Sequence, residues 1–286
     1  MTRFTKTNYQ SQAADTSIEA DIFLFQKLKQ LSLQQRIEIA ANHDRGVKKL
    51  CLAGIKWRHP QATFAEIRLL FSRAVLGEKF HPNFQPISNH ESMWIQDSIS
   101  LAGELHQIFD LIKIPYYISR GVASSIYGEP HSTRDLDLVI QIPTNQIDLL
   151  VKTLEDARFY CPAGAVEDLK NQREKMLNIT HTETIANADI YLMDNSQFAN
   201  SQMSRKKLLN LEGIPVFWVI SPEDLILQKL LWGKSSQSEK QWRDVLGILK
   251  LQAESLDDSY LTEWSEKLDI VDTFNQALQA VTNPEN

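Results

Sequence analysis

The sequence has little cysteine and no long apolar segment. Its two cysteines, Cys51 and Cys161, lie in separate segments without metal-ligand spacing, so neither a disulfide framework nor a cysteine metal site is expected. Both thiols are expected to be reduced, as in a cytosolic protein. No stretch reaches the roughly 18 apolar residues of a membrane span, and the start, MTRFTKTNYQSQ, lacks a signal peptide's apolar core. We therefore expect a cytoplasmic protein without a membrane partner.

The chain also lacks an excess of basic residues, an internal repeat and a low-complexity tract. Its net charge of -6 argues against a general nucleic-acid coat, although a local basic patch can still meet RNA or nucleotide. The run Arg205, Lys206 and Lys207 is either such a contact for a polyanionic acceptor or a solvated face. With 43% hydrophobic and 23% charged residues, the 286 residues fit one large globular domain or two ordinary ones.

Helical patterns occupy the N-terminal third of the sequence. Helix starts with capping-box spacing occur at Thr16, Ser32 and Thr63, each followed three residues later by Glu or Gln. A polar, proline-containing segment at 80–91 breaks the helical pattern. We expect a disordered tail at 1–15 and a helical domain at 16–90, which carries no chemistry and serves in homo-oligomer or partner contacts, such as with an antitoxin.

The rest of the chain mixes strands and helices. An amphipathic helix is expected at 92–113 and further helices at 144–158 and 165–175, with strands at 116–119, 176–180, 186–193 and 216–220. Ser221 and Pro222 start a helical region that runs to the C-terminal end. The predicted class is α+β, with a core at 91–220 and a helical region at 221–286 packed on it.

Two carboxylates open the strand that follows a small-residue turn and a short helix. Asp135 and Asp137 are two apart, so on a strand both side chains point to the same face. Two ionised carboxylates a few ångströms apart repel each other unless a cation joins them, and oxygen ligands suit Mg²⁺. The alternative is an exposed pair at a strand start, because Asp-x-Asp is a common sequence.

Asp189 is a third carboxylate, on a later predicted strand between apolar neighbours. An unpaired charge in such a position is costly, which favours a place beside Asp135 and Asp137 at a metal. The alternative puts Asp189 at a strand end in water. If the three converge, they predict a site with two metal ions, where one activates a hydroxyl and the other neutralises phosphate charge.

Three motifs in order resemble the polymerase-beta-like nucleotidyltransferase superfamily. They are GVASSIYGEPHSTRDLDLVI, then NADIYL, and then SPEDLILQKL with WRDVLGIL. The resemblance covers about residues 92–281 and is closest to the minimal branch that contains AbiEii-type toxins. It implies a mixed β-sheet core with flanking helices, NTP as substrate, and Asp135, Asp137 and Asp189 as catalytic residues that bind Mg²⁺.

The resemblance also assigns nucleotide contacts. Gly121 takes the second position of the phosphate-binding turn, where glycine lets backbone N–H groups approach phosphate. Arg120 stands where the family usually has the first glycine, and either crowds the turn or contacts phosphate itself. Ser124 and Ser125 are phosphate contacts or packed serines, and Lys229 is a nucleotide contact or a solvated residue. Where relatives have an arginine after the proline, this chain has His131.

Three functions follow from this pattern. The first is an Mg²⁺-dependent nucleotidyltransferase that moves NMP from NTP to a hydroxyl of RNA, protein or a small molecule, within a toxin–antitoxin or defence system. The second is a catalytically inactive relative that binds nucleotide or a partner, which Arg120 favours. The third, a helical adaptor, leaves the ordered acidic and glycine positions unexplained.

Overall fold

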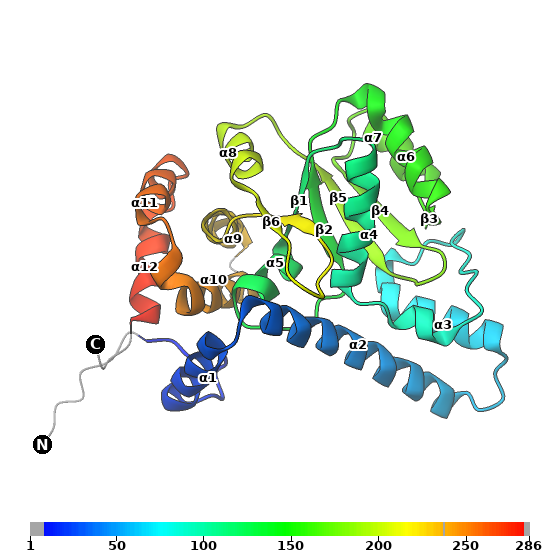
Figure 1. The fold of residues 1–286 in the computed structure, drawn as a ribbon, viewed down its shortest axis with the longest axis horizontal. Helices are drawn as coiled ribbons and strands as arrows, with labels where there is room; N and C mark the ends of the chain where they lie inside the picture. The colour runs from blue at the N-terminus through cyan, green and yellow to red at the C-terminus, as the bar shows by residue number, and fades with distance from the viewer. Residues whose placement is uncertain (1–8, 237, 283–286) are drawn as a thin grey trace, which may run out of the picture. The chain divides into compact units, whose positions relative to one another are not determined.

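The structure is a computed structural model that describes residues 9–236 and 238–282 (Figure 1). It divides into two compact units. The helical unit takes the described residues of the ranges 1–36, 123–130 and 221–286, and the sheet unit takes Ile37–Val122 and His131–Ile220. The sheet unit ends at residue 220, but residues 123–130, inside the expected core 91–220, belong to the helical unit. The expected domain 16–90 does not agree with this division either, because its residues are divided between the two units at residue 36.

The helical unit is built around one central helix. Its helices are α1 (Ile18–Gln30), α9 (Pro222–Ser236), α10 (Glu239–Gln252), α11 (Asp258–Lys267) and α12 (Val271–Val281). Helix α10 packs against α1, α9 and α12. Ahead of α1, the buried Tyr9 donates a hydrogen bond to Asp21, which also pairs with Lys250 at 2.6 Å. Residues 9–15 of the expected tail therefore pack in this unit, whereas 1–8 lie outside the described residues.

The sheet unit contains a mixed sheet that has seven strands within the described residues. The strands are β1 (Tyr116–Ser119), β2 (Leu136–Ile140), β3 (Phe159–Tyr160), β4 (Met176–His181), β5 (Asn187–Leu192), β6 (Lys207–Leu209) and β7 (Phe217–Val219). Their order is β3-β4-β5-β2-β1-β7-β6. The neighbours β2 and β5 run parallel, as do β1 and β7, and the other pairs are antiparallel. The expected mixed sheet with flanking helices is confirmed.

The helices of this unit surround the sheet (Figure 1). They are α3 (Phe64–Leu76), α4 (Ser98–Leu111), α6 (Ile147–Asp156), α7 (Ala163–Lys170) and α8 (Gln197–Arg205), with most of α2 (Leu33–Arg58) and the first turn of α5 (Arg120–Tyr127). Helix α4 packs over β2 and β7, α6 against β3, and α7 against β4. No described helix is both long and apolar enough to cross a membrane.

Two of the expected helix starts are confirmed by their hydrogen bonds. Ser32 and Gln35 exchange backbone-to-side-chain hydrogen bonds before α2, and Thr63 with Glu66 forms a capping box before α3. The first start is shifted by one residue, since Ser17 rather than Thr16 caps α1. These local patterns act through residues that are neighbours in sequence, which is why the sequence shows them.

The expected helix at 92–113 is wrong in its first part. Residues Glu91–Ile95 form a 3-10 helix, and α4 starts only at Ser98. Asp97 has an extended backbone and accepts a hydrogen bond from the Ser100 N–H, so it caps α4 and interrupts the apolar periodicity. Helix α8 and strand β6, on either side of Lys206, were not expected, and the basic run thus joins a helix end to a short strand.

The N-terminal helices belong to the core of the sheet unit. Leu52 of α2, Phe71 of α3 and Trp94 lie in one apolar cluster with Ile185, which follows β4. Burying these large side chains together removes several hundred square ångströms of apolar surface from water, at roughly 25 cal/mol per Å². This packing fixes the segment between α3 and α4 against the sheet.

Candidate active site

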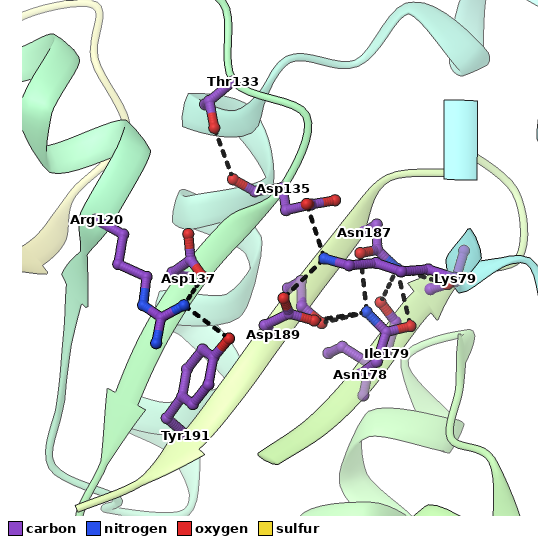
Figure 2. Close-up of polar contacts among 12 residues, drawn as sticks. Lys79, Arg120, Thr133, Asp135, Asp137, Asn178, Ile179, Asn187, Asp189 and Tyr191 are labelled. Atoms are coloured by element: carbon purple, nitrogen blue, oxygen red, sulfur yellow. Dashed lines mark hydrogen bonds and ion pairs between the residues drawn. The ribbon is translucent and has the colours of Figure 1, made fainter. Parts of the chain in front are cut away.

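The three expected aspartates lie on one face of two neighbouring strands (Figure 2). In the parallel pair of β2 and β5, Asp137 and Asp189 are register partners. Asp135 lies two residues before Asp137 and directly precedes β2. The alternating side chains of β2, Leu136 and Leu138, are fully buried on the opposite face. The alternation of a strand therefore sends the apolar side chains into the core and the carboxylates to one shared site.

A lysine from outside the expected core reaches this site. The Nζ atom of Lys79 lies 2.7 Å from Oδ2 of Asp135 and 2.7 Å from Oδ2 of Asp189 (Figure 2). Burial acts to lower the pKa of Lys79, but its hydrogen bonds to both aspartates and their charges raise it above its ordinary value. Lys79 is therefore a cation at neutral pH and neutralises part of the acidic cluster.

Asp189 is the most buried carboxylate of the three. Its side chain is 7% exposed, and its second oxygen accepts a hydrogen bond from Asn178 Nδ2 at 2.7 Å. Asn178 also bonds to Asn187, so the amide is held in a network between β4 and β5. A buried carboxylate with both oxygens bonded is fixed in orientation, as a metal ligand or proton acceptor needs to be.

Asp137 has a raised pKa. Burial raises the pKa of Asp137 to about 6, with further upward contributions from Asp189 and Asp135. The guanidinium of Arg120, 3.6 Å from Asp137 Oδ1, opposes the shift, as does Lys79. Arg120 is thus a second cation, after Lys79, beside the three carboxylates. Together the two cations do not offset the effect of burial on the pKa of Asp137.

Arg120 is held beside Asp137 by its contacts and by an unusual backbone conformation. Its φ is +54°, in the left-handed region that favours glycine, and the resemblance described above leads us to expect a glycine at this position. The guanidinium lies 4.1 Å from the ring centroid of Tyr191 and donates a hydrogen bond to the Tyr191 hydroxyl at 3.0 Å. Tyr191 on β5 therefore turns Arg120 toward the carboxylates.

Gly121 fits a close approach of two segments. A Cβ atom at this position would lie 2.6 Å from Oγ1 of Thr133, in the loop that leads to Asp135. Thr133 in turn donates its hydroxyl to the backbone oxygen of Asp135 and its N–H to the buried Asp44 of α2. Gly121 and Asp44 therefore set the position of the loop that carries Asp135.

The carboxylate oxygens of Asp135, Asp137 and Asp189 are chemically suited to a divalent ion. Oδ1 of Asp135 is buried and has no hydrogen-bond partner among the described residues, which is costly for a carboxylate oxygen without a ligand. Three carboxylates on one strand face offer the hard oxygen atoms that Mg²⁺ binds. As they stand, however, no three His, Cys, Asp or Glu side chains within residues 9–236 and 238–282 are placed to hold one ion. Lys79 occupies the space that Asp135 and Asp189 share.

The other residues expected to contact nucleotide belong to the helical unit. Ser124 and Ser125 are buried on α5. Lys229 on α9 is also buried, and is therefore not the solvated residue of the alternative; its Nζ atom lies 2.6 Å from Asp244 and 2.9 Å from Gln241, both on α10. It borders a cavity of about 270 Å³ in this unit. Their part in nucleotide binding stays a prediction.

Sequence reasoning missed Lys79, Asp44, Asn178 and Tyr191. Lys79 is 110 residues from Asp189 and lies in the part of the chain where no chemistry was expected. Asn178 and Tyr191 carried a usable signal, since both lie on expected strands. Asn178 is the register partner of Asp189, and Tyr191 lies two residues after Asp189 and so shares its face. For Lys79 and Asp44 no local pattern exists, because only the packing of α2 and α3 brings them here.

Comparison with known proteins adds little to the observations on the site. No family model and no curated protein matches the sequence. The chain is similar to a solved structure described as an antigenic nucleotidyltransferase-like protein from Paracoccidioides brasiliensis, with 18% identity and a TM-score of 0.44. The match covers 64% of this chain and 93% of that chain. A likeness this distant carries no conclusion about activity, so the function rests on the chain's own residues.

Proposed function

We propose that the protein is a divalent-metal-dependent nucleotidyltransferase. The observation that supports this most is the placement of Asp135, Asp137 and Asp189 on one face, with Asp137 and Asp189 in register on parallel strands. Nothing in packing requires three carboxylates to meet at a site where burial raises the pKa of one of them. A site of this kind gains its stability when cations bind.

The reaction assigned to the site is transfer of a nucleoside monophosphate. An acceptor hydroxyl oxygen forms a bond to the α-phosphorus of an NTP, the bond from that phosphorus to the bridging oxygen breaks, and pyrophosphate leaves. The hydroxyl proton passes to a base, for which the fixed carboxylate of Asp189 is the candidate. Bound Mg²⁺, held by Asp135, Asp137 and Asp189, would lower the pKa of the hydroxyl and neutralise phosphate charge.

Arg120 is assigned a contact with the phosphates. The Arg120 side chain is 37% exposed while its guanidinium stacks on Tyr191, so it lies at the surface of the site, where an incoming phosphate would meet it. The backbone N–H groups at the start of α5, beside Gly121, supply further donors for an anion. As finer parts of the proposal, the acceptor is a hydroxyl of RNA, protein or a small molecule, and the protein acts in a toxin–antitoxin or defence pair of the AbiEii type.

A second candidate function is a silent relative that binds nucleotide or a partner without turnover. Two observations favour it. Lys79 and Arg120 already pair with the three carboxylates, and the glycine of the phosphate-binding turn is replaced by Arg120. In that case the cations of the chain take the place of the metal ions permanently.

Release of pyrophosphate separates the two functions. With Mg²⁺, each NTP and a panel of RNA, protein and small-alcohol acceptors, the wild-type protein is expected to release pyrophosphate and label the acceptor. Asp137→Asn is expected to reduce the rate about a hundredfold or more, because the site loses a charged ligand. Asp110→Asn, at an exposed aspartate paired with Lys113, is the matched control and retains the rate.

The opposite result is equally informative. Nucleotide binding without pyrophosphate from any NTP and acceptor would establish the silent relative instead. Equal rates for Asp137→Asn and the wild-type protein would show that the carboxylate face is not the reacting site.

A further inference from the structure

Lys79 is a cation that two of the three carboxylates share. Its Nζ atom is 2.7 Å from one oxygen of Asp135 and 2.7 Å from one oxygen of Asp189, on two different strands. No other described side chain pairs with both of these carboxylates. A metal ion bridging the two would take the space between them and Oδ2 of Asp189, whose other oxygen is bonded to Asn178, so a divalent ion and the ammonium group compete for the same site.

The segment that carries Lys79 is fixed in place. Lys79 ends the 3-10 helix Gly77–Lys79, directly after α3. Leu76 before it and Phe84 after it are buried in the apolar cluster of the sheet unit. Nδ1 of His81 lies 2.7 Å from the hydroxyl of Tyr160 on β3, so the segment is also tied to the sheet edge. The backbone therefore presents Lys79 to the carboxylates, and only the side chain has to move for it to leave.

The side chain has a route out of the site. Lys79 is 28% exposed, in contrast to Asp189 at 7%, so the ammonium group can exchange its carboxylate contacts for water. Its four-carbon stem has the rotational freedom to do so without a backbone change. When Lys79 leaves, its ion pairs with Asp135 and Asp189 are lost. The binding free energy of the divalent ion has to exceed the free energy of these two ion pairs.

We infer that Lys79 is a built-in competitor for the divalent ion, which occupies the Asp135–Asp189 site until the ion displaces it and thereby sets the metal concentration at which the site is loaded. This inference rests on the proposed function, since it concerns the metal of that same site. It adds a residue from the N-terminal helical segment to the control of the site. The consequence is a higher apparent Kd for the metal ion than three unopposed carboxylates would give.

The first experiment measures Mn²⁺ binding directly, by the loss of the free-ion signal in electron paramagnetic resonance. Lys79→Met removes the competing charge and is expected to lower the Kd for Mn²⁺ about tenfold or more. Lys113→Met, which removes an exposed lysine paired with Asp110, is the matched control and is expected to leave the Kd unchanged. Asp189→Asn is expected to weaken binding in the wild-type and Lys79→Met backgrounds alike.

A second experiment uses the wild-type protein and does not depend on the folding of a variant. The amine of Lys79 is labelled with an acylating reagent, and the modified site is quantified by mass spectrometry with and without Mn²⁺. Displacement by the ion is expected to raise labelling of Lys79 several-fold, because an ammonium group held by two carboxylates reacts slowly. Labelling of Lys113 serves as the internal standard.

The outcomes separate this inference from the proposed function. An equal or higher Kd in Lys79→Met, with Asp189→Asn still weakening binding, overturns the competitor and leaves the metal-dependent enzyme. Unchanged labelling of Lys79 while Mn²⁺ binds overturns it as well. If neither the wild-type protein nor Lys79→Met binds Mn²⁺, both the competitor and the metal-dependent function fall.

Discussion

Replacing Asp137 by asparagine is expected to make the metal-free protein more stable at neutral pH. Burial raises the pKa of this carboxyl from 3.8 to about 6, and the charges of Asp189 and Asp135 add to the shift. The cations Arg120 and Lys79 oppose it but do not cancel it. The ionised side chain is therefore held in the folded state at a cost, as is common for residues that serve a site rather than the fold.

The size of the effect follows from the shift. A rise of roughly two pKa units corresponds to about 3 kcal/mol, at about 1.4 kcal/mol per unit. This is an upper limit, because asparagine also gives up the attraction between the carboxylate and Arg120 at 3.6 Å. Arg120 keeps its hydrogen bond and stacking contact with Tyr191 in the variant. The expected gain is about 1–3 kcal/mol in the free energy of unfolding at pH 8.

The pH dependence has a definite sign. Because the folded-state pKa of Asp137 lies above its unfolded value, the folded protein binds the proton more tightly, and ionisation destabilises it. The cost is absent below about pH 4, grows between pH 4 and 6, and is complete above pH 6. The stability difference between Asp137→Asn and the wild-type protein is expected to follow the same course, from near zero at pH 4 to its full value at pH 8.

Urea unfolding in EDTA between pH 4 and 8 measures this difference, with the exposed Asp110→Asn as the control. Titrating groups that do not interact with Asp137 change both proteins equally and cancel in the comparison. A variant that is less stable than the wild-type protein at pH 8 would refute the reasoning, as would a difference independent of pH. Either result would mean that the attraction to Arg120 outweighs burial. With the expected result, loss of pyrophosphate release in this variant cannot be attributed to unfolding.

Two further substitutions test the positioning of the loop and the buried pair of the helical unit. Gly121→Ala is expected to cost about 1–3 kcal/mol and to reduce metal binding, because its Cβ would meet Thr133 Oγ1 at 2.6 Å. The control Gly164→Ala, on α7 with nothing within 4 Å of the added Cβ, is expected to leave metal binding unchanged and not to lower stability. Equal urea midpoints for Gly121→Ala and the wild-type protein would contradict this. Lys229→Met is expected to cost about 3–5 kcal/mol by leaving Asp244 without its 2.6 Å partner, and Asp244→Leu in the same chain should restore part of that loss in thermal unfolding. No recovery would show that the lysine acts through other contacts.

Features that depend on neighbours in sequence were determined by the sequence alone. The capping boxes at Ser32 and Thr63 and the strands that carry Asp137 and Asp189 are where the local patterns place them. A strand repeats every two residues, so the shared face of Asp135 and Asp137 follows from spacing. That strands and helices share one core follows for the same reason, since the two kinds of pattern are told apart before any packing is known.

Features set by long-range packing were decided only by the tertiary structure. The division into two units cuts through the expected helical domain, and Asp97 interrupts a helix that periodicity alone extends to residue 92. A helical pattern shows which face is apolar but not which surface that face covers. The packing of α2 and α3 on the sheet is therefore invisible in the sequence.

Lys79 shows this difference most directly. In the sequence it is a charged residue after a helix, in a segment where no chemistry was expected. In the structure the apolar cluster around Leu76 and Phe84 brings it to two carboxylates 56 and 110 residues away along the chain. The sequence determined the three aspartates and the strands that align them. The tertiary structure decided which cation they hold, because that depends on a contact between segments that only folding brings together.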